Sequence, residues 1–364
     1  MVFNRGDRGE EMYDLFNKDL KTILNRKILF KGIRYTIIIG LIISTILNLR
    51  LLNRAKLLKA VNNFHPIIFL DLIIILFLSW VVAGLRIKFL VDSIGHKISL
   101  KKCMLIFLEA RFVSHVTPFA TGGGPFQIYF LKKVGLDTAE ASTVVLIQFV
   151  LRVLFLSLST LLCLTIFSSA IDSEIIPESI FYILFSLILF LVILTTILII
   201  FPGIMHKFIN LVFSNEIIRR HLKNSYKIRK MIVRLKQEIF NFRKSFSLIS
   251  QERWSLAAAG VCTVSYWLLI FSIAPIIFIG FGQPPNFIYS FVMQVLFFFI
   301  QPFMPTPGAA GIAELGFASL FISFLPNNII GLVTIIWRFF TYYIELLIGG
   351  FLVIKTIGKK ELGE

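Results

Sequence analysis

The sequence predicts an all-α protein that crosses a membrane repeatedly and contains an internal inverted repeat. Three observations predict this fold. Hydrophobic residues make up 57% of the chain and charged residues 16%, with a mean hydropathy of +0.85, whereas a soluble domain is about a quarter charged. The apolar residues form long runs rather than one-sided helical stripes. Two of these runs are broken at corresponding places by proline and glycine.

Six apolar runs are long enough to span a bilayer, which takes about 20 residues at a rise of about 1.5 Å per residue. They cover approximately residues 33–49, 66–85, 141–169, 179–201, 254–281 and 329–354. The first run follows a mixed-charge segment, 1–32, and no small-residue cleavage signal follows it closely. We therefore interpret it as a retained helix rather than a signal peptide, and residues 33–364 as one transmembrane domain.

Two further apolar stretches, 103–131 and 287–325, are interrupted by Thr-Pro-Phe-Ala-Thr-Gly-Gly-Gly-Pro and by Pro-Thr-Pro-Gly-Ala-Ala-Gly. Proline removes a backbone donor and glycine permits non-helical dihedral angles, so lipid cannot satisfy the backbone of either tip. We predict two re-entrant hairpins, each made of two half-helices around an unwound tip. Ordinary kinked spanning helices are the alternative. The prolines of the predicted tips are Pro118, Pro125, Pro305 and Pro307.

An internal repeat relates the two broken stretches. The separations of Pro118, Gly124, Gln127 and Arg152 nearly match those of Pro305, Gly311, Glu314 and Arg338. Both copies run from a Pro/Gly break to a polar residue one helical turn later, and then to an arginine in the next long apolar helix. We therefore divide the domain into repeat one, about 66–201, a basic cytoplasmic segment, about 203–253, and repeat two, about 254–356.

The charges between the apolar runs predict the orientation. The segment 202–253 carries twelve Lys or Arg and three acidic residues, whereas the loop 172–178 has acidic residues and no Lys or Arg. The positive-inside rule places the first in the cytoplasm, together with both termini, and the second outside the plasma membrane. The first hairpin then dips in from the cytoplasm and the second from the opposite face. The basic stretch 50–59 would lie outside, and we interpret it as an interfacial helix.

Inverted repeats with broken helices are a common way for secondary transporters to build a binding site near the membrane midplane. A charge inside an apolar helix costs about 2.5–3.5 kcal/mol on insertion scales, so such residues usually pair or serve function. We expect Arg152 and Arg338 to converge on a phosphate or carboxylate, with Glu314 balancing the charge. A structural Glu314–Arg338 pair is the alternative. Glu345 falls seven positions after Arg338, on the same helical face, and is expected to join the site.

Further candidate residues flank the two tips. Arg111 and His115 lie one helical turn apart and can face one cavity; a snorkelling Arg111 and a neutral, hydrogen-bonded His115 are the alternatives. Glycine N–H groups at the start of a half-helix favour an anionic headgroup. The remaining substrate-binding candidates are Gly122, Gly123, Gly124, Gln127, Gly308 and Gly311.

The residue pattern argues against several other classes of protein. The net charge of +17 gathers between apolar segments, where the positive-inside rule places it, so we expect no nucleic-acid partner. Cys103, Cys163 and Cys262 share no metal-ligand spacing, and no catalytic motif occurs. We therefore expect no metal, no cofactor and no catalytic residue.

Three stretches of sequence carry a family resemblance. They are WVVAGLRIKFL from Trp80, TPFATGGGPFQIYFLKKVGL from Thr117, and MPTPGAAGIAELGF from Met304 with the later Trp337-Arg338. These stretches resemble the transmembrane domain of lysylphosphatidylglycerol synthases and the flippase-like proteins that consist of this domain alone. Such proteins often have Gly-Gly where this chain has Ala309-Ala310, and Arg where it has Gln127.

The resemblance implies a lipid flippase or translocase that moves the head of an anionic or aminoacylated phospholipid, or of a polyprenyl-phosphate lipid, across the plasma membrane. Full-length synthases carry a separate soluble domain that transfers lysine from charged tRNA, and we expect this chain to lack that activity. Two alternatives stay open: a phosphatidylglycerol lysyltransferase-type enzyme, and a small-solute or ion-coupled transporter. The expected partners are the transported lipid and anionic inner-leaflet lipids, which would hold the basic segment at about 1 kcal/mol per charge. A homo-oligomer is also compatible with the sequence.

Overall fold

Every regular element in the described part of the chain is helical. The computed structural model describes residues 64–166, 186, 188–190, 193, 245–249 and 251–361. The predicted crossing 33–49 and almost all of the crossing 179–201 lie outside these residues, as do the segment 1–32 and most of the basic segment. The all-α prediction is confirmed.

Four long helices coincide with predicted membrane crossings. They are α4 (Ile67–Asp92), α7 (Thr138–Ile166), α12 (Arg253–Gly280) and the continuous helix formed by α15 (Asn327–Arg338), η5 (Phe339–Tyr343) and α16 (Ile344–Glu361). Each contains a span long and apolar enough to cross a bilayer. The 26 residues of α4, for example, extend about 39 Å.

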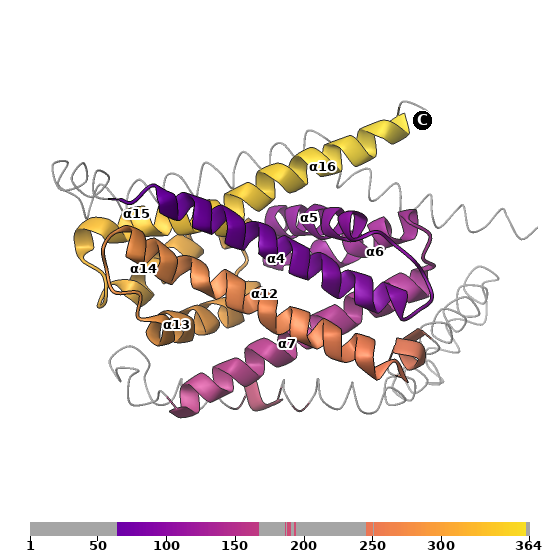
Figure 1. The fold of residues 1–364 in the computed structure, drawn as a ribbon, viewed down its shortest axis with the longest axis horizontal. Coiled ribbons are helices and arrows are strands. Elements are labelled where there is room, and N and C mark those ends of the chain that lie inside the picture. The colour runs from indigo at the N-terminus through magenta and orange to yellow at the C-terminus, as the bar shows by residue number, and fades with distance from the viewer. Residues whose placement is uncertain are drawn as a thin grey trace, which may run out of the picture.

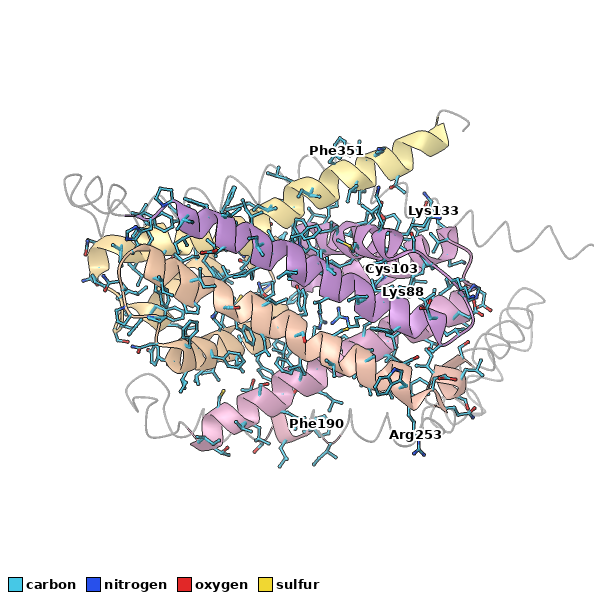
Figure 2. All side chains as sticks on the ribbon, viewed as in Figure 1. Lys88, Cys103, Lys133, Phe190, Arg253 and Phe351 are labelled. Atoms are coloured by element: carbon cyan, nitrogen blue, oxygen red, sulfur yellow. The ribbon has the colours of Figure 1, made fainter. Side chains whose placement is uncertain are left out.

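The outer faces of these helices carry exposed apolar side chains, as contact with lipid requires. Phe77 on α4, Leu162 on α7 and Phe351 on α16 are all more than half exposed. Figure 2 shows Phe351 projecting from the bundle. The chain is therefore a polytopic α-helical membrane protein.

The most extensive helix contact joins α4 to α12, which run side by side (Figure 1). The backbone N–H of His65 donates to the Gly280 carbonyl over 3.0 Å, and the Phe64 ring packs against Gly280. The start of α4 therefore lies at the end of α12, and the two helices are antiparallel.

Both broken stretches form two short helices around an unwound tip, as predicted. The first consists of α5 (Leu100–Val116), the turn η1 (Pro118–Ala120) and α6 (Gly123–Lys133). The second consists of α13 (Phe287–Ile300), the turns η3 (Gln301–Phe303) and η4 (Pro307–Ala309), and α14 (Ile312–Phe321). The two tips meet, because η1 packs against η4.

The two hairpins extend into the bundle from opposite ends. α4 ends shortly before α5 begins, and α7 begins shortly after α6 ends. Both ends of the first hairpin therefore lie at the end of the bundle where α4 ends. α12 ends shortly before α13 begins, and α15 begins shortly after α14 ends, so the second hairpin opens where α4 starts. Figure 1 accordingly shows α5 and α6 toward one end and α13 and α14 toward the other.

The two tips share one backbone path. Each contains two consecutive residues with positive φ, Phe119 and Ala120 at 54° and 53°, and Gly308 and Ala309 at 59° and 54°. The second of these residues donates its N–H three positions back, to the carbonyl of a threonine in an extended conformation.

This common path corrects the predicted register of the repeat by two residues. The segment Thr117-Pro-Phe-Ala-Thr-Gly matches Thr306-Pro-Gly-Ala-Ala-Gly, and both segments end at the glycine that precedes the second half-helix. Pro118 therefore corresponds to Pro307 rather than to Pro305. In this register Gln127 is not the counterpart of Glu314, because Pro125 occupies that place.

A π-helical segment, η5, lies between α15 and α16. Such a wide turn changes the rotation of the helix that follows it, so residues on either side no longer keep the spacing of a regular helix. The prediction that Glu345 shares a face with Arg338 is therefore wrong, and the two side chains bind different partners.

Candidate functional site

A buried ion pair holds the second tip. The Glu314 carboxylate, in the first turn of α14, accepts hydrogen bonds from Arg338 Nε over 2.9 Å and from the Gly311 N–H over 2.7 Å. Arg338 also donates from Nη2 to the Gly308 carbonyl over 2.9 Å. Glu314 is 1% exposed and Arg338 2%. The two side chains neutralise each other's charge. They also hydrogen-bond to the Gly311 N–H and the Gly308 carbonyl of the tip, which is the geometry of a structural pair.

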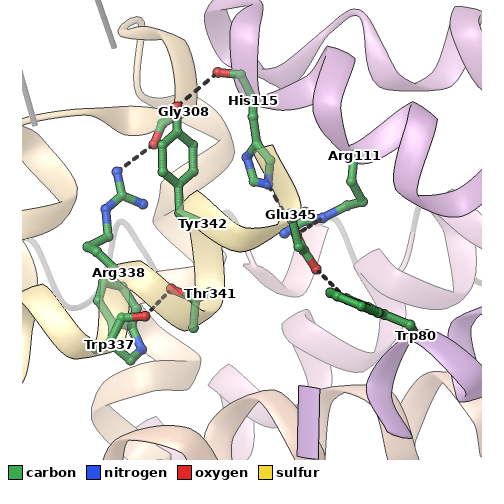
Figure 3. Close-up of polar contacts among 9 residues, drawn as sticks. All are labelled: Trp80, Arg111, His115, Gly308, Trp337, Arg338, Thr341, Tyr342 and Glu345. Atoms are coloured by element: carbon green, nitrogen blue, oxygen red, sulfur yellow. Dashed lines mark hydrogen bonds and ion pairs between the residues drawn. The ribbon is translucent and has the colours of Figure 1, made fainter. Parts of the chain in front are cut away.

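Tyr342 connects this ion pair to the first hairpin. The Arg338 guanidinium lies over its ring, 4.4 Å from the ring centroid, and the His115 ring meets it edge-on with centroids 4.5 Å apart. The Tyr342 hydroxyl donates to the His115 carbonyl over 3.4 Å. A Cβ atom on Gly308 would overlap the Tyr342 ring, so glycine is needed for this packing. Figure 3 shows Tyr342 between Arg338 and His115.

A second polar cluster surrounds Glu345 in α16. Its carboxylate accepts from Arg111 Nε over 2.8 Å and from Trp80 Nε1 over 3.4 Å, and lies 3.1 Å from His115 Nε2. Glu345 is 1% exposed, whereas the Arg111 side chain is 31% exposed. The cluster ties α4 and α5 to α16, and Figure 3 shows the three donors converging on the carboxylate.

Arg152 and Arg338 share no partner among the described residues. Arg152 lies in α7, with its guanidinium 5.4 Å from the centroid of the Phe149 ring. The charged groups that act on it most strongly are Arg111 and Arg86, not Arg338. Arg338 is instead enclosed by Glu314 and the second tip.

The three glycines of the first tip differ in their surroundings. The Gly122 N–H donates to Thr117 Oγ1 over 3.0 Å. A Cβ atom on Gly123 would overlap Ser114 Oγ, so this glycine allows α6 to approach α5 closely. Gly124 has more room, since a Cβ atom there would lie 3.7 Å from the nearest atom, in the side chain of Val145. The other candidate of this hairpin, Gln127, bonds Gln148 of α7 over 3.2 Å.

Four residues that take part in contacts at or beside these clusters were not chosen as site residues from the sequence alone. They are Trp80, Tyr342, and Arg86 with Tyr266, whose ring centroid lies 5.7 Å from the Arg86 guanidinium carbon. Arg86 had a usable signal, since an arginine inside the long apolar helix α4 is unusual by composition alone. The aromatic residues had none, because aromatic side chains in membrane helices most often pack or anchor at the interface.

The fold and these clusters define a polytopic membrane protein with discontinuous helices and ion pairs buried among its apolar helices. The chain belongs to the family described as the lysylphosphatidylglycerol synthase TM region, which matches residues 37–349. The match includes both hairpins and both polar clusters.

A second comparison gives a relative that is also described as a membrane protein. The chain is 28% identical over 295 residues to a UPF0104 membrane protein from Archaeoglobus fulgidus, an alignment that covers 78% of this chain and 84% of the relative. No solved structure matches the chain.

Proposed function

We propose that this protein translocates the polar head of an anionic or aminoacylated phospholipid across the plasma membrane while the acyl chains stay in the bilayer. The observation that carries the proposal is the meeting of two Pro/Gly-broken hairpins that extend from opposite ends of the bundle. Unwound backbone at membrane depth is tolerated only in protein or beside a wet cavity, and transporters use such paired breaks to form a substrate site.

The hairpins would then be re-entrant, the first from the cytoplasm and the second from outside, with both termini cytoplasmic. The partly exposed Arg111 would meet the headgroup, and Arg152 its phosphate, while the Glu314–Arg338 pair would hold the second tip in place. The family description favours lysylphosphatidylglycerol or phosphatidylglycerol over a polyprenyl-phosphate lipid as the substrate.

A scrambling assay tests this proposal. The purified protein is reconstituted into liposomes that contain a trace of phosphatidylglycerol or lysylphosphatidylglycerol with a fluorophore on an acyl chain near the headgroup. The loss of fluorescence on adding dithionite reports the lipid that reaches the outer leaflet. We expect the wild-type protein to expose label beyond the fraction that protein-free liposomes expose.

The Arg111→Gln variant should slow this exchange. The matched control is Lys88→Gln, which breaks an exposed ion pair to Asp92 on α4 and should exchange lipid as the wild type does. The proposal would be contradicted if liposomes with the wild-type protein exposed no more labelled phosphatidylglycerol or lysylphosphatidylglycerol than protein-free liposomes do.

A further inference from the structure

Arginines from three different helices, Arg86, Arg111 and Arg152, lie close enough to Tyr266 to interact with it electrostatically, and Arg86 also lies over its ring. Arg86 of α4 places its guanidinium carbon 5.7 Å from the centroid of the Tyr266 ring in α12. Arg152 of α7 interacts electrostatically with Arg86, with Arg111 of α5 and with Tyr266. Tyr266 in turn interacts with all three arginines. The contacts of α4 with α5, α7 and α12 bring these positions together.

Within the part of the chain that the structure describes, the charge of this arginine cluster is not balanced. Glu345 is the carboxylate that contacts it, and its ion pair is with Arg111. Among the described residues, neither Arg86 nor Arg152 forms an ion pair. Three arginines against one carboxylate leave two positive charges within the helix bundle, where an uncompensated charge is costly.

Arg86 also has an unused donor. The residue is 8% exposed, and its Nε atom is buried without a hydrogen-bond partner. Buried donors are nearly always paired, so an orphan of this kind indicates a missing partner. A planar guanidinium fits an acceptor with several oxygens, and phosphate is the anion that guanidinium groups bind in bidentate fashion.

We propose that Arg86, Arg111 and Arg152 form a binding site for one phosphate group, enclosed by α4, α5, α7 and α12. That the phosphate belongs to a transported lipid rests on the proposed function. Arg86 and Arg152 hold the phosphate with the two charges that no carboxylate of the described residues neutralises. Arg111, already bound to Glu345, contributes its remaining donors.

A nearby apolar groove favours a lipid phosphate over a free one. The groove, of about 410 Å³, lies between α7 and α13 and is lined by Leu158, Ser159, Leu162, Cys163, Phe287, Ile288, Phe291 and Val292. Ser159 lies seven residues after Arg152, which is two helical turns or about 10 Å along the same face of α7. An acyl chain in this groove can therefore belong to a lipid whose phosphate lies at Arg152.

Ligand binding to the full chain in detergent tests the site separately from transport. Three probes are titrated by calorimetry: a short-chain phosphatidylglycerol, inorganic phosphate, and a diacylglycerol with the same chains. We expect the phosphatidylglycerol to bind wild type and to bind Arg86→Gln and Arg152→Gln at least about tenfold more weakly. Lys88→Gln, two positions after Arg86 on the exposed face of α4, should bind as the wild type does.

The probes distinguish the two sources of phosphate. Tight binding of phosphatidylglycerol with weak binding of inorganic phosphate assigns the site to a lipid, and the reverse assigns it to the free anion. Equal binding of diacylglycerol and phosphatidylglycerol would overturn the proposal, as would unchanged affinity in both glutamine variants.

Stability provides a second readout. Since Arg86 is an unpaired buried charge, Arg86→Gln should unfold at the same or a higher temperature than wild type, and bound phosphatidylglycerol should stabilise wild type more than the variant. If a glutamine variant does not fold, Arg152→Lys, which keeps the charge but loses the planar fork, takes its place and should still weaken binding. If the wild type scrambles lipid but the variants bind phosphatidylglycerol normally, the proposed phosphate site is wrong and the proposed function stands. If the wild type binds phosphatidylglycerol through these arginines but does not scramble it, the site stands and the proposed function is wrong.

Discussion

At the residue scale, the arginines within the helix bundle fall into two kinds. Arg338 and Arg111 are paired with Glu314 and Glu345, whereas Arg86 and Arg152 have no carboxylate partner among the described residues. Removing one member of a buried pair typically costs about 3–5 kcal/mol, because the other charge is left without compensation. Removing an unpaired charge carries no such cost. Paired and unpaired arginines should therefore respond oppositely to neutral substitution.

The Glu314–Arg338 pair can be tested by a double-mutant cycle. Glu314→Gln keeps an oxygen that can accept from the Gly311 N–H but leaves Arg338 charged and buried, so the melting temperature should fall. Arg338→Gln should lower it for the complementary reason. The double variant should recover part of the loss. Additive losses, measured by thermal unfolding in detergent, would show that the two side chains do not act as a pair.

The Glu345 cluster should respond asymmetrically. Glu345→Gln leaves Arg111, Arg86 and Arg152 without a carboxylate partner among the described residues. Arg111→Gln, in contrast, leaves Glu345 with Trp80, His115 and nearby positive charge. The Arg111 side chain is also 31% exposed and can be hydrated. Glu345→Gln should therefore lower the melting temperature more than Arg111→Gln. The opposite order would indicate that the cluster is not electropositive.

At the scale of the elements, each hairpin depends on a tip whose backbone leaves the helical path. The turn η1 packs against η4, so the shape of one tip constrains the other. A glycine matters here only where a Cβ atom would meet a neighbour. The first tip offers adjacent glycines with different surroundings, which makes a controlled comparison available.

Gly123→Ala should destabilise the protein, whereas Gly124→Ala should have little effect. The added methyl group at position 123 would overlap Ser114 Oγ, but at position 124 the nearest atom is 3.7 Å away. Overpacking of this kind typically costs about 1–3 kcal/mol. Ser114→Ala should restore part of the stability of Gly123→Ala, because it removes the atom in conflict. Equal melting temperatures for the two single variants would contradict the close approach of α5 and α6.

The first hairpin should have both ends on the cytoplasmic side. Single cysteines at Lys101 and Lys132, in a background without Cys103, Cys163 and Cys262, should react with an impermeant thiol reagent only when the cytoplasmic face is accessible. The packing of α5 against α6 supports this arrangement. Labelling of the two positions from opposite sides would make the first hairpin a spanning segment.

At the scale of the whole molecule, the arrangement of the repeats depends on the orientation of the chain in the membrane. The loop 172–178 and the segment 202–253 carry opposite charge, although both fall almost entirely outside the described residues. A cysteine at Ser173 should therefore react from outside the cell and one at Ser225 from the cytoplasm. Reaction of both from one side would contradict the predicted inversion of the repeats.

The sequence by itself determined the class of protein, the positions of the long helices that the structure describes, and the places where two apolar stretches break. Apolar length and Pro/Gly chemistry are local properties, so they can be read without knowledge of the fold. The sequence also predicted the Glu314–Arg338 pair as one of two alternatives, because a charged side chain inside the membrane usually has a partner of opposite charge.

Only the tertiary structure decided which charges meet. The π-helical segment after Arg338 gives Glu345 different partners, and no periodicity rule foresees an extra residue in a helical turn. The register of the repeat became clear only from the matching backbone conformations of the two tips. Phe119 and Gly308 occupy equivalent positions with positive φ, although their side chains are unlike. Arg86 and Arg152 come from helices far apart in sequence, and packing alone places their unbalanced charges near one ring.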